Sequence, residues 1–212
     1  GSYLGSLVVG AGLFSMFLFV GLYLQTVLGY TPLRSGFAFL PFTAGIIVFA
    51  GIASQLLPKV GPKRLMVPGL VAAAIGLLML TRITPETSYV THVLPSLLIM
   101  SSGMALVFIP LSTTSLHGVG NRDAGVASAL LNTSQQVGGS LGTALLNTVA
   151  ATAATSYMAS NPDKAPTFGI THGFTVAFTV SSALLLVGAV VLFFFINIGK
   201  EAVVETEGVI AH

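Results

Sequence analysis

The sequence predicts an all-α membrane protein in which six transmembrane helices form one bundle. Hydrophobic residues make up 54% of the 212 residues and charged residues only 7%, whereas a soluble domain carries roughly 25% charged residues. One soluble core of this size could not hide so much apolar surface. The few charged residues also lie between long apolar stretches, which is the pattern of helices that cross the hydrocarbon core of a bilayer.

Six stretches are long enough to cross a bilayer core, which takes about 20 predominantly apolar residues in a helix. The predicted spans are residues 5–28, 35–57, 65–82, 92–114, 123–154 and 171–198. They form one domain, a six-helix transmembrane bundle over residues 1–199, and a polar cytoplasmic tail follows over residues 200–212. Glycine, proline and asparagine predict loops at residues 29–36 and 160–166.

Charged residues mark the boundary of each span. In order along the chain, the separating charges are Arg34; Lys59, Lys63 and Arg64; Arg82 and Glu86; Arg122 and Asp123; and Asp163 and Lys164. Cytoplasmic loops carry an excess of lysine and arginine, and short loops count most. The compact basic loop at residues 58–64 therefore predicts a cytoplasmic N-terminus and a cytoplasmic C-terminus in a multi-pass protein of the cell membrane.

Composition excludes several function classes. The net charge of +2 is too small to indicate a nucleic-acid partner, and the absence of cysteine excludes thiolate metal sites. No spacing typical of metal ligands or of a phosphate-binding loop is present. Ser102 and His172 could suggest a serine hydrolase, but Ser102 lies about 15 Å down its span and His172 lies at a span end. We therefore predict neither an enzyme, nor a metal site, nor a cofactor.

The fifth span combines membrane length with a polar face. On a helical projection, small and polar residues fall within an arc of about 140°. They are Gly125, Ser128, Asn132, Gln135, Gln136, Gly139, Gly142, Thr143 and Asn147. Bulky apolar residues occupy the opposite side. Because an unsatisfied amide in hydrocarbon is costly, the polar face is expected to meet protein or water.

Two interpretations of this face remain open. Small residues allow close helix packing, and the spacing of Gly138 and Gly142 predicts such a contact. Alternatively, the polar face lines a hydrated substrate path, for which the candidates are Asn132, Gln135, Gln136 and Gly139. Gln25, near the outer end of the first span, and Ser102, in the middle of the fourth, are weaker candidates for the same path.

Three segments resemble the major facilitator superfamily. They are LQTVLGYTPLRSGFAFLPFTAG at residues 24–45, LLPKVGPKRLMVPG at 56–69 and NRDAGVASALLNTSQQVGGSLGTAL at 121–145. More narrowly, they resemble the C-terminal six helices of the fourteen-helix drug:proton antiporters of the QacA/EmrB type. Aligned on Gly61, the basic loop is similar to the family's cytoplasmic signature at Lys59, Lys63 and Arg64, but Pro58 stands at its acidic position.

The resemblance implies a mechanism of alternating access. Two six-helix bundles would enclose a central cavity, and the first, second, fourth and fifth helices of this bundle would approach it. The partners implied are the lipid bilayer, apolar or cationic drug-like substrates and the N-terminal half of the same transporter, with the proton gradient as the energy source. No carboxylate lies well inside a span, since Asp123 stands at the edge of the fifth, so the coupling acid is expected upstream. The chain begins Gly-Ser, and we expect it to be a piece of a longer protein.

Three functions remain under comparison. The first is the C-terminal half of a proton-coupled multidrug exporter, which would contribute half of the cavity. The second is a self-associating, half-size six-helix transporter. The third is a non-transporting membrane scaffold, whose helices would need polar faces only at contacts. The amide-rich face of the fifth span favours transport over a scaffold.

Overall fold

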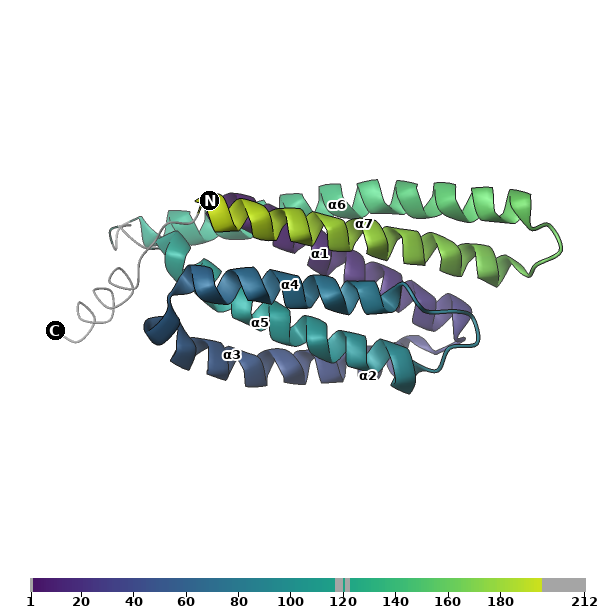
Figure 1. Cartoon of the computed structure of the whole chain (residues 1–212), viewed down its shortest axis with the longest axis horizontal. Coiled ribbons are helices and arrows are strands. Elements are labelled where there is room, and N and C mark those ends of the chain that lie inside the picture. The colour runs from purple at the N-terminus through teal and green to yellow at the C-terminus, as the bar shows by residue number, and fades with distance from the viewer. Residues whose placement is uncertain (1, 117–119, 121–122, 196–212) are drawn as a thin grey trace.

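The computed structural model describes residues 2–116, 120 and 123–195, and within these ranges all regular structure is helical, as predicted (Figure 1). The π-helical turn η1 follows α1, and the π-helical turn η2 precedes α5. The elements are α1 (Ser2–Leu22), η1 (Tyr23–Val27), α2 (Pro32–Ala38), α3 (Leu40–Val60), α4 (Pro62–Leu80), η2 (Tyr89–Val93), α5 (Leu94–Leu116), α6 (Ala124–Ser160) and α7 (Pro166–Phe195).

Five stretches of the described chain are long and apolar enough to cross a membrane. They are Gly5–Val27, Pro32–Val60, Pro62–Leu80, Tyr89–Ser115 and Pro166–Phe194. The remaining predicted span corresponds to α6, whose 37 residues would reach about 55 Å. Its length suffices, but its serine, asparagine, glutamine and threonine residues lower its hydropathy. The six-span count therefore depends on α6, the helix with the polar face.

The helices form two groups of three (Figure 1). One group consists of α1, α6 and α7, and the other of α3, α4 and α5. The groups meet where α4 packs on α7 and, less extensively, where α1 and α6 contact α5. Exchanging α1 with α5, α3 with α6 and α4 with α7 maps the packed pairs onto one another, except that, among the described residues, the minor α5–α6 contact has no comparable counterpart between α1 and α3. The bundle thus has the approximate internal symmetry of an inverted repeat.

The core lies between these two groups and consists of aliphatic, aromatic and methionine side chains. Met16, Phe19, Leu77, Met100 and Phe178 are among its fully buried members. One hydrogen bond also links the groups: the buried Ser182 hydroxyl of α7 donates to the Ala74 carbonyl of α4 at 3.1 Å. Packing and a buried hydrogen bond are the forces available to associated helices in a bilayer.

Two loops predicted from the sequence are shorter in the structure. Residues 32–36 are helical, because the Thr31 side chain caps α2 by accepting from the Arg34 amide at 3.3 Å and Pro32 occupies the first turn. Residues 58–64 are also mostly helical, since α3 continues through Pro58 to Val60. Gly61 alone connects α3 to α4, with a φ of 82° that other residues rarely adopt.

Several helices extend beyond the predicted spans, most of all α6 and α7. The helix α6 continues to Ser160 instead of ending at 154, and α7 begins at Pro166 instead of 171. In both places the apolar pattern becomes weak while the chain remains helical. Hydropathy alone therefore places the end of α6 too early and the start of α7 too late. The predicted tail at 200–212 and the end of the last span at 196–198 lie outside the described residues.

Tyrosines of η1 and η2 tie together the end of the bundle opposite the α3–α4 connection. The buried Tyr23 of η1 donates its hydroxyl to the Thr84 carbonyl at 2.8 Å. Tyr89 of η2 donates its hydroxyl to the Ala38 carbonyl at 2.6 Å. Each bond joins a helix end to a segment more than 50 residues away in sequence. The first bond joins the end of α1 to the connection between α4 and η2 in the other group, and the second joins η2 to α2, which precedes α3.

Candidate functional site

Three faces run along α6, where the sequence predicted two. A buried stripe of small and aliphatic residues packs on α1 and α7 and includes Gly138, Gly142 and Leu146. Beside it lies an exposed polar stripe with Asn132, Gln136 and Asn147. The third face is exposed and apolar, formed by Val126, Leu130, Val137, Leu141 and Leu145. Glycines and amides that share one arc of the helical projection are therefore separated by packing: Gly139 and Gly142 are buried, whereas Asn132 and Gln136 are exposed.

The glycines bring the backbones of α1 and α6 together. A Cβ atom added at Gly138 would meet the backbone carbonyl of Leu7, and one added at Gly142 would meet Ala11. Gly10 of α1 lies in the same way against the backbone of Gln135. Residues larger than glycine would hold the two helices farther apart, so this stripe sets how closely α1 approaches α6.

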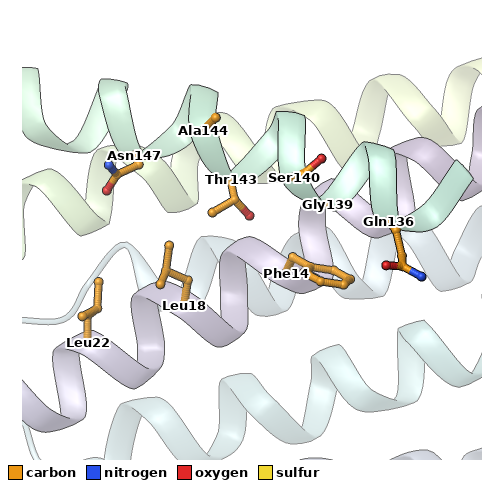
Figure 2. A pocket seen from close by; sticks show the side chains of 9 residues that line it. All are labelled: Phe14, Leu18, Leu22, Gln136, Gly139, Ser140, Thr143, Ala144 and Asn147. Atoms are coloured by element: carbon orange, nitrogen blue, oxygen red, sulfur yellow. The ribbon is translucent and has the colours of Figure 1, made fainter. Parts of the chain in front are cut away.

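A groove of about 640 Å³ lies along the α1–α6 contact (Figure 2). Its α1 wall is apolar and presents Phe14, Leu18 and Leu22. Its α6 wall is mostly polar, and its residues are Gln136, Gly139, Ser140, Thr143, Ala144 and Asn147. At Gly139 an added Cβ would lie 2.7 Å from the Phe14 ring, so the glycine leaves room for that ring against α6. The volume falls in the range of small-molecule sites.

The polar wall offers amide groups without a charge. No Asp, Glu, Lys or Arg is among the nine lining residues. Within the described part of the chain, the exposed amides of Gln136 and Asn147 make no hydrogen bond, whereas the Ser140 hydroxyl donates to the Val137 carbonyl at 3.0 Å. Amides at membrane depth are costly unless they meet water or protein. This wall therefore faces an aqueous path, a ligand or another helix bundle.

The remaining predicted path residues lie outside the groove. Asn132 is exposed one turn before Gln136 on the same polar stripe, and Gln135 is half-buried beside Gly10. Gln25 is exposed in η1, just beyond the groove residue Leu22. Ser102 of α5 donates its hydroxyl to the Ile99 carbonyl at 2.7 Å, a bond within its own helix. Of the six candidates, only Gln136 and Gly139 line the groove.

Several lining residues were not singled out from the sequence as path residues. Phe14, Leu18 and Leu22 recur at intervals of four along α1, and Ser140 and Ala144 continue the same spacing from Gln136 on α6. This spacing was the available signal, because side chains four apart share one helix face. It was not sufficient, since α1 is apolar on all sides and the sequence does not show which face meets α6.

The basic residues at the α3–α4 connection lie in helix ends and not in an extended loop. Lys59 is exposed in the last turn of α3, whereas Lys63 and Arg64 occupy the first turn of α4. Gly61 between them is buried. The Lys63 Nζ lies 4.3 Å from the centroid of the Phe193 ring of α7, a cation–π arrangement. The connection and the end of α7 thus form one basic edge of the bundle.

Comparisons with known proteins agree with this architecture. The puromycin resistance protein pur8 of Streptomyces alboniger is 42% identical over 208 residues, which cover 94% of this chain and 41% of that protein. The cephamycin export protein CmcT of Amycolatopsis lactamdurans is 35% identical over 147 residues, covering 69% of this chain and 30% of that protein. The chain thus spans less than half the length of these curated relatives.

A solved structure shares the fold at low sequence identity. A bacterial homologue of the human drug peptide transporters PepT1 and PepT2 superposes with a TM-score of 0.73 and 18% identity, over 99% of this chain and 46% of that one. The sequence profile of the Major Facilitator Superfamily matches residues 2–143, which include α1, the inverted-repeat partner α5 and the first half of α6. Helix order, internal symmetry and sequence agree: the chain belongs to the Major Facilitator Superfamily of membrane transporters.

Proposed function

We propose that the chain is the C-terminal six-helix half of a proton-coupled exporter of drug-like molecules, and that it supplies one wall of a central path. The groove between α1 and α6 carries this proposal. It places two amides without hydrogen-bond partners opposite an apolar aromatic wall at membrane depth. Such a mixed surface suits molecules that combine rings with a few polar groups. The drug-resistance and export proteins among its relatives support the same substrate class.

The groove has the chemistry to recognise a substrate but not to move a proton. Gln136 and Asn147 can each donate and accept hydrogen bonds, while Phe14 can contact an aromatic ring or, through its π face, a cation. Proton coupling in antiporters of this type uses a carboxylate within the membrane, and the interiors of the spans contain no Asp or Glu. We therefore assign the coupling carboxylate to a preceding N-terminal half, which would also complete the cavity for alternating access. The fourteen-helix QacA/EmrB type remains the subfamily that we propose.

Transport in inverted membrane vesicles tests this assignment. The longer protein that contains this chain is expected to accumulate a fluorescent cationic drug when the vesicle interior is acidified, and to release it when an ionophore collapses the pH difference. Before the ionophore is added, each uptake of drug should be accompanied by the exit of protons from the vesicle interior, read with a pH-sensitive dye. Accumulation that persists after the pH difference has collapsed would contradict proton coupling but not drug transport.

Expression of residues 1–212 alone separates the alternatives. As half of a two-bundle transporter, the chain alone should insert into the membrane without transporting the drug, because its groove has no opposite wall. A self-associating half-size transporter would accumulate the drug on its own. A scaffold would transport nothing, whether alone or as part of the longer protein. Membrane levels are matched by immunoblot in each case.

The proposed topology places the α3–α4 connection in the cytoplasm of the cell. Lysine and arginine are concentrated there at Lys59, Lys63 and Arg64, which is the bias of cytoplasmic loops. The chain has no cysteine, so a single cysteine introduced at Lys59 can be labelled selectively. A membrane-impermeant maleimide should label it only after permeabilisation, whereas a cysteine at Asp163 in the α6–α7 connection should react in intact cells. The opposite pattern would invert the topology.

A further inference from the structure

A second groove lies at the basic edge of the bundle, away from the α1–α6 site. It has a volume of about 450 Å³ and is lined by Lys63, Arg64, Val67 and Pro68 of α4 and by Phe193 of α7. Lys63 is half-buried, with its ammonium 4.3 Å from the centre of the Phe193 ring, and Arg64 is exposed. The groove thus holds two cations above an apolar floor.

Its position is the boundary between the membrane and water. The lining residues of α4 lie in the first turns of the apolar span Pro62–Leu80, and Phe193 lies at the end of the apolar span Pro166–Phe194. Figure 1 shows the start of α4 and the end of α7 at the same end of the bundle. Cationic side chains at this depth meet lipid headgroups, while the floor below them meets acyl chains.

Exposed apolar residues continue from the groove toward the membrane interior. On α4, Val71, Ile75 and Leu78 are exposed on the helix face that carries Arg64 and Pro68. On α7, Leu186 and Val190 are exposed on the face that carries Phe193. Residues three and four apart share a face, so both helices present an apolar track that begins at the basic groove.

The polar groups of the groove are available to a ligand. Neither Lys63 nor Arg64 makes a salt bridge within the described part of the chain. Pro68 lies four residues after Arg64 inside α4, and because proline has no N–H it cannot donate to the Arg64 carbonyl. Two positive charges therefore lie at the mouth of an apolar track, and the Arg64 carbonyl lacks its usual helical donor.

We propose that this groove binds an anionic phospholipid with a hydroxylated headgroup, of the phosphatidylglycerol class. The phosphate would lie between Lys63 and Arg64, and a headgroup hydroxyl would donate to the Arg64 carbonyl. The acyl chains would follow Val71 and Val190 along the two helices. Basic pockets between transmembrane helices on the cytoplasmic side are suited to such headgroups, and the inner leaflet follows from the proposed topology. The site lies outside the drug groove and is independent of it.

Lipid titration of the purified full-length protein, followed by native mass spectrometry, tests the proposal. Phosphatidylglycerol should bind at a saturable site, and phosphatidylcholine with the same acyl chains should not. Lys63→Gln and Arg64→Gln should each weaken phosphatidylglycerol binding about fivefold, the factor expected for one cation at a membrane surface. Lys59→Gln is the matched control, because it removes one cation from the same edge but lines no part of the groove. It should change binding less than about twofold.

Three results would overturn the proposal. Equal weakening by Lys59→Gln and Lys63→Gln would mean that diffuse surface charge attracts the lipid. Equal binding of phosphatidylglycerol and phosphatidylcholine would show that the groove does not select a negatively charged headgroup. Displacement of the lipid by soluble glycerol phosphate at millimolar concentration would assign the groove to a water-soluble anion. A gel-filtration profile matching the wild type shows for each variant that the fold is retained.

Discussion

Gly138→Ala is expected to destabilise the bundle by about 1–3 kcal/mol, the usual cost of an overpacked core. The added methyl group would meet the Leu7 backbone, whose carbonyl carbon lies 2.6 Å from the position of the new Cβ. A backbone atom cannot turn away as a flexible side chain can, so α1 and α6 must separate. Separation would also displace Gly142 from Ala11 and Gly10 from the Gln135 backbone.

Gly125→Ala is the matched control for this prediction. It lies on the same helix, and a Cβ atom added there would have no neighbour within 4 Å among the residues that the structure describes. Alanine should leave stability unchanged or raise it by about 0.5–1 kcal/mol through its better helix propensity. Thermal unfolding of both variants in the same detergent, followed by intrinsic tyrosine fluorescence or by loss of the monodisperse gel-filtration peak, provides the comparison. Equal stability of the two variants would refute the close packing of α1 on α6.

Replacing both Gln136 and Asn147 with leucine is expected to abolish most drug export while leaving membrane insertion intact. Both side chains line the groove and have no hydrogen-bond partner in the described chain, so the folded bundle loses no bond. A substrate that bonds to either amide would lose about tenfold in transport for each replacement, as expected when a polar partner is left unmatched. The measurement is the rate of drug efflux from cells, normalised to protein in the membrane.

Two further variants decide whether the groove or the whole polar stripe matters. Thr133→Leu changes an exposed polar residue of α6 outside the groove and should leave efflux unchanged. Asn132→Leu changes a residue that was predicted from the sequence, like Gln136, to line the path. In the structure Asn132 lies one turn beyond the groove. A small effect at Asn132 and a large one at Gln136 supports the groove as the path. If drug efflux is undiminished in the double Gln136 and Asn147 variant, these amides do not line the substrate path.

The sequence predicted the fold because its determinants are local. Each apolar stretch must satisfy its own backbone in a bilayer, and only a helix does so within one segment. Hydropathy therefore located the long helices, and charges marked their boundaries, but the short helix α2 was predicted as part of a loop. Hydropathy placed the ends of α6 and α3 too early and the start of α7 too late, because residues 155–160, 58–60 and 166–170 remain helical beyond the predicted spans. The one-residue connection at Gly61 was also missed, because a glycine with positive φ is identified only from the backbone.

The candidate site was predicted only in part because it depends on a contact between distant segments. The periodicity of residues 125–147 was enough to identify a polar face and the glycine spacing of Gly138 and Gly142. It could not separate the glycines from the amides, since that separation arises when α1 covers one edge of the face and leaves the other open. Sequence alone thus determined a helical membrane bundle with an amide-bearing helix. The tertiary structure decided which amides face a groove, because the rotation of α6 against α1 is set by the close approach of their backbones.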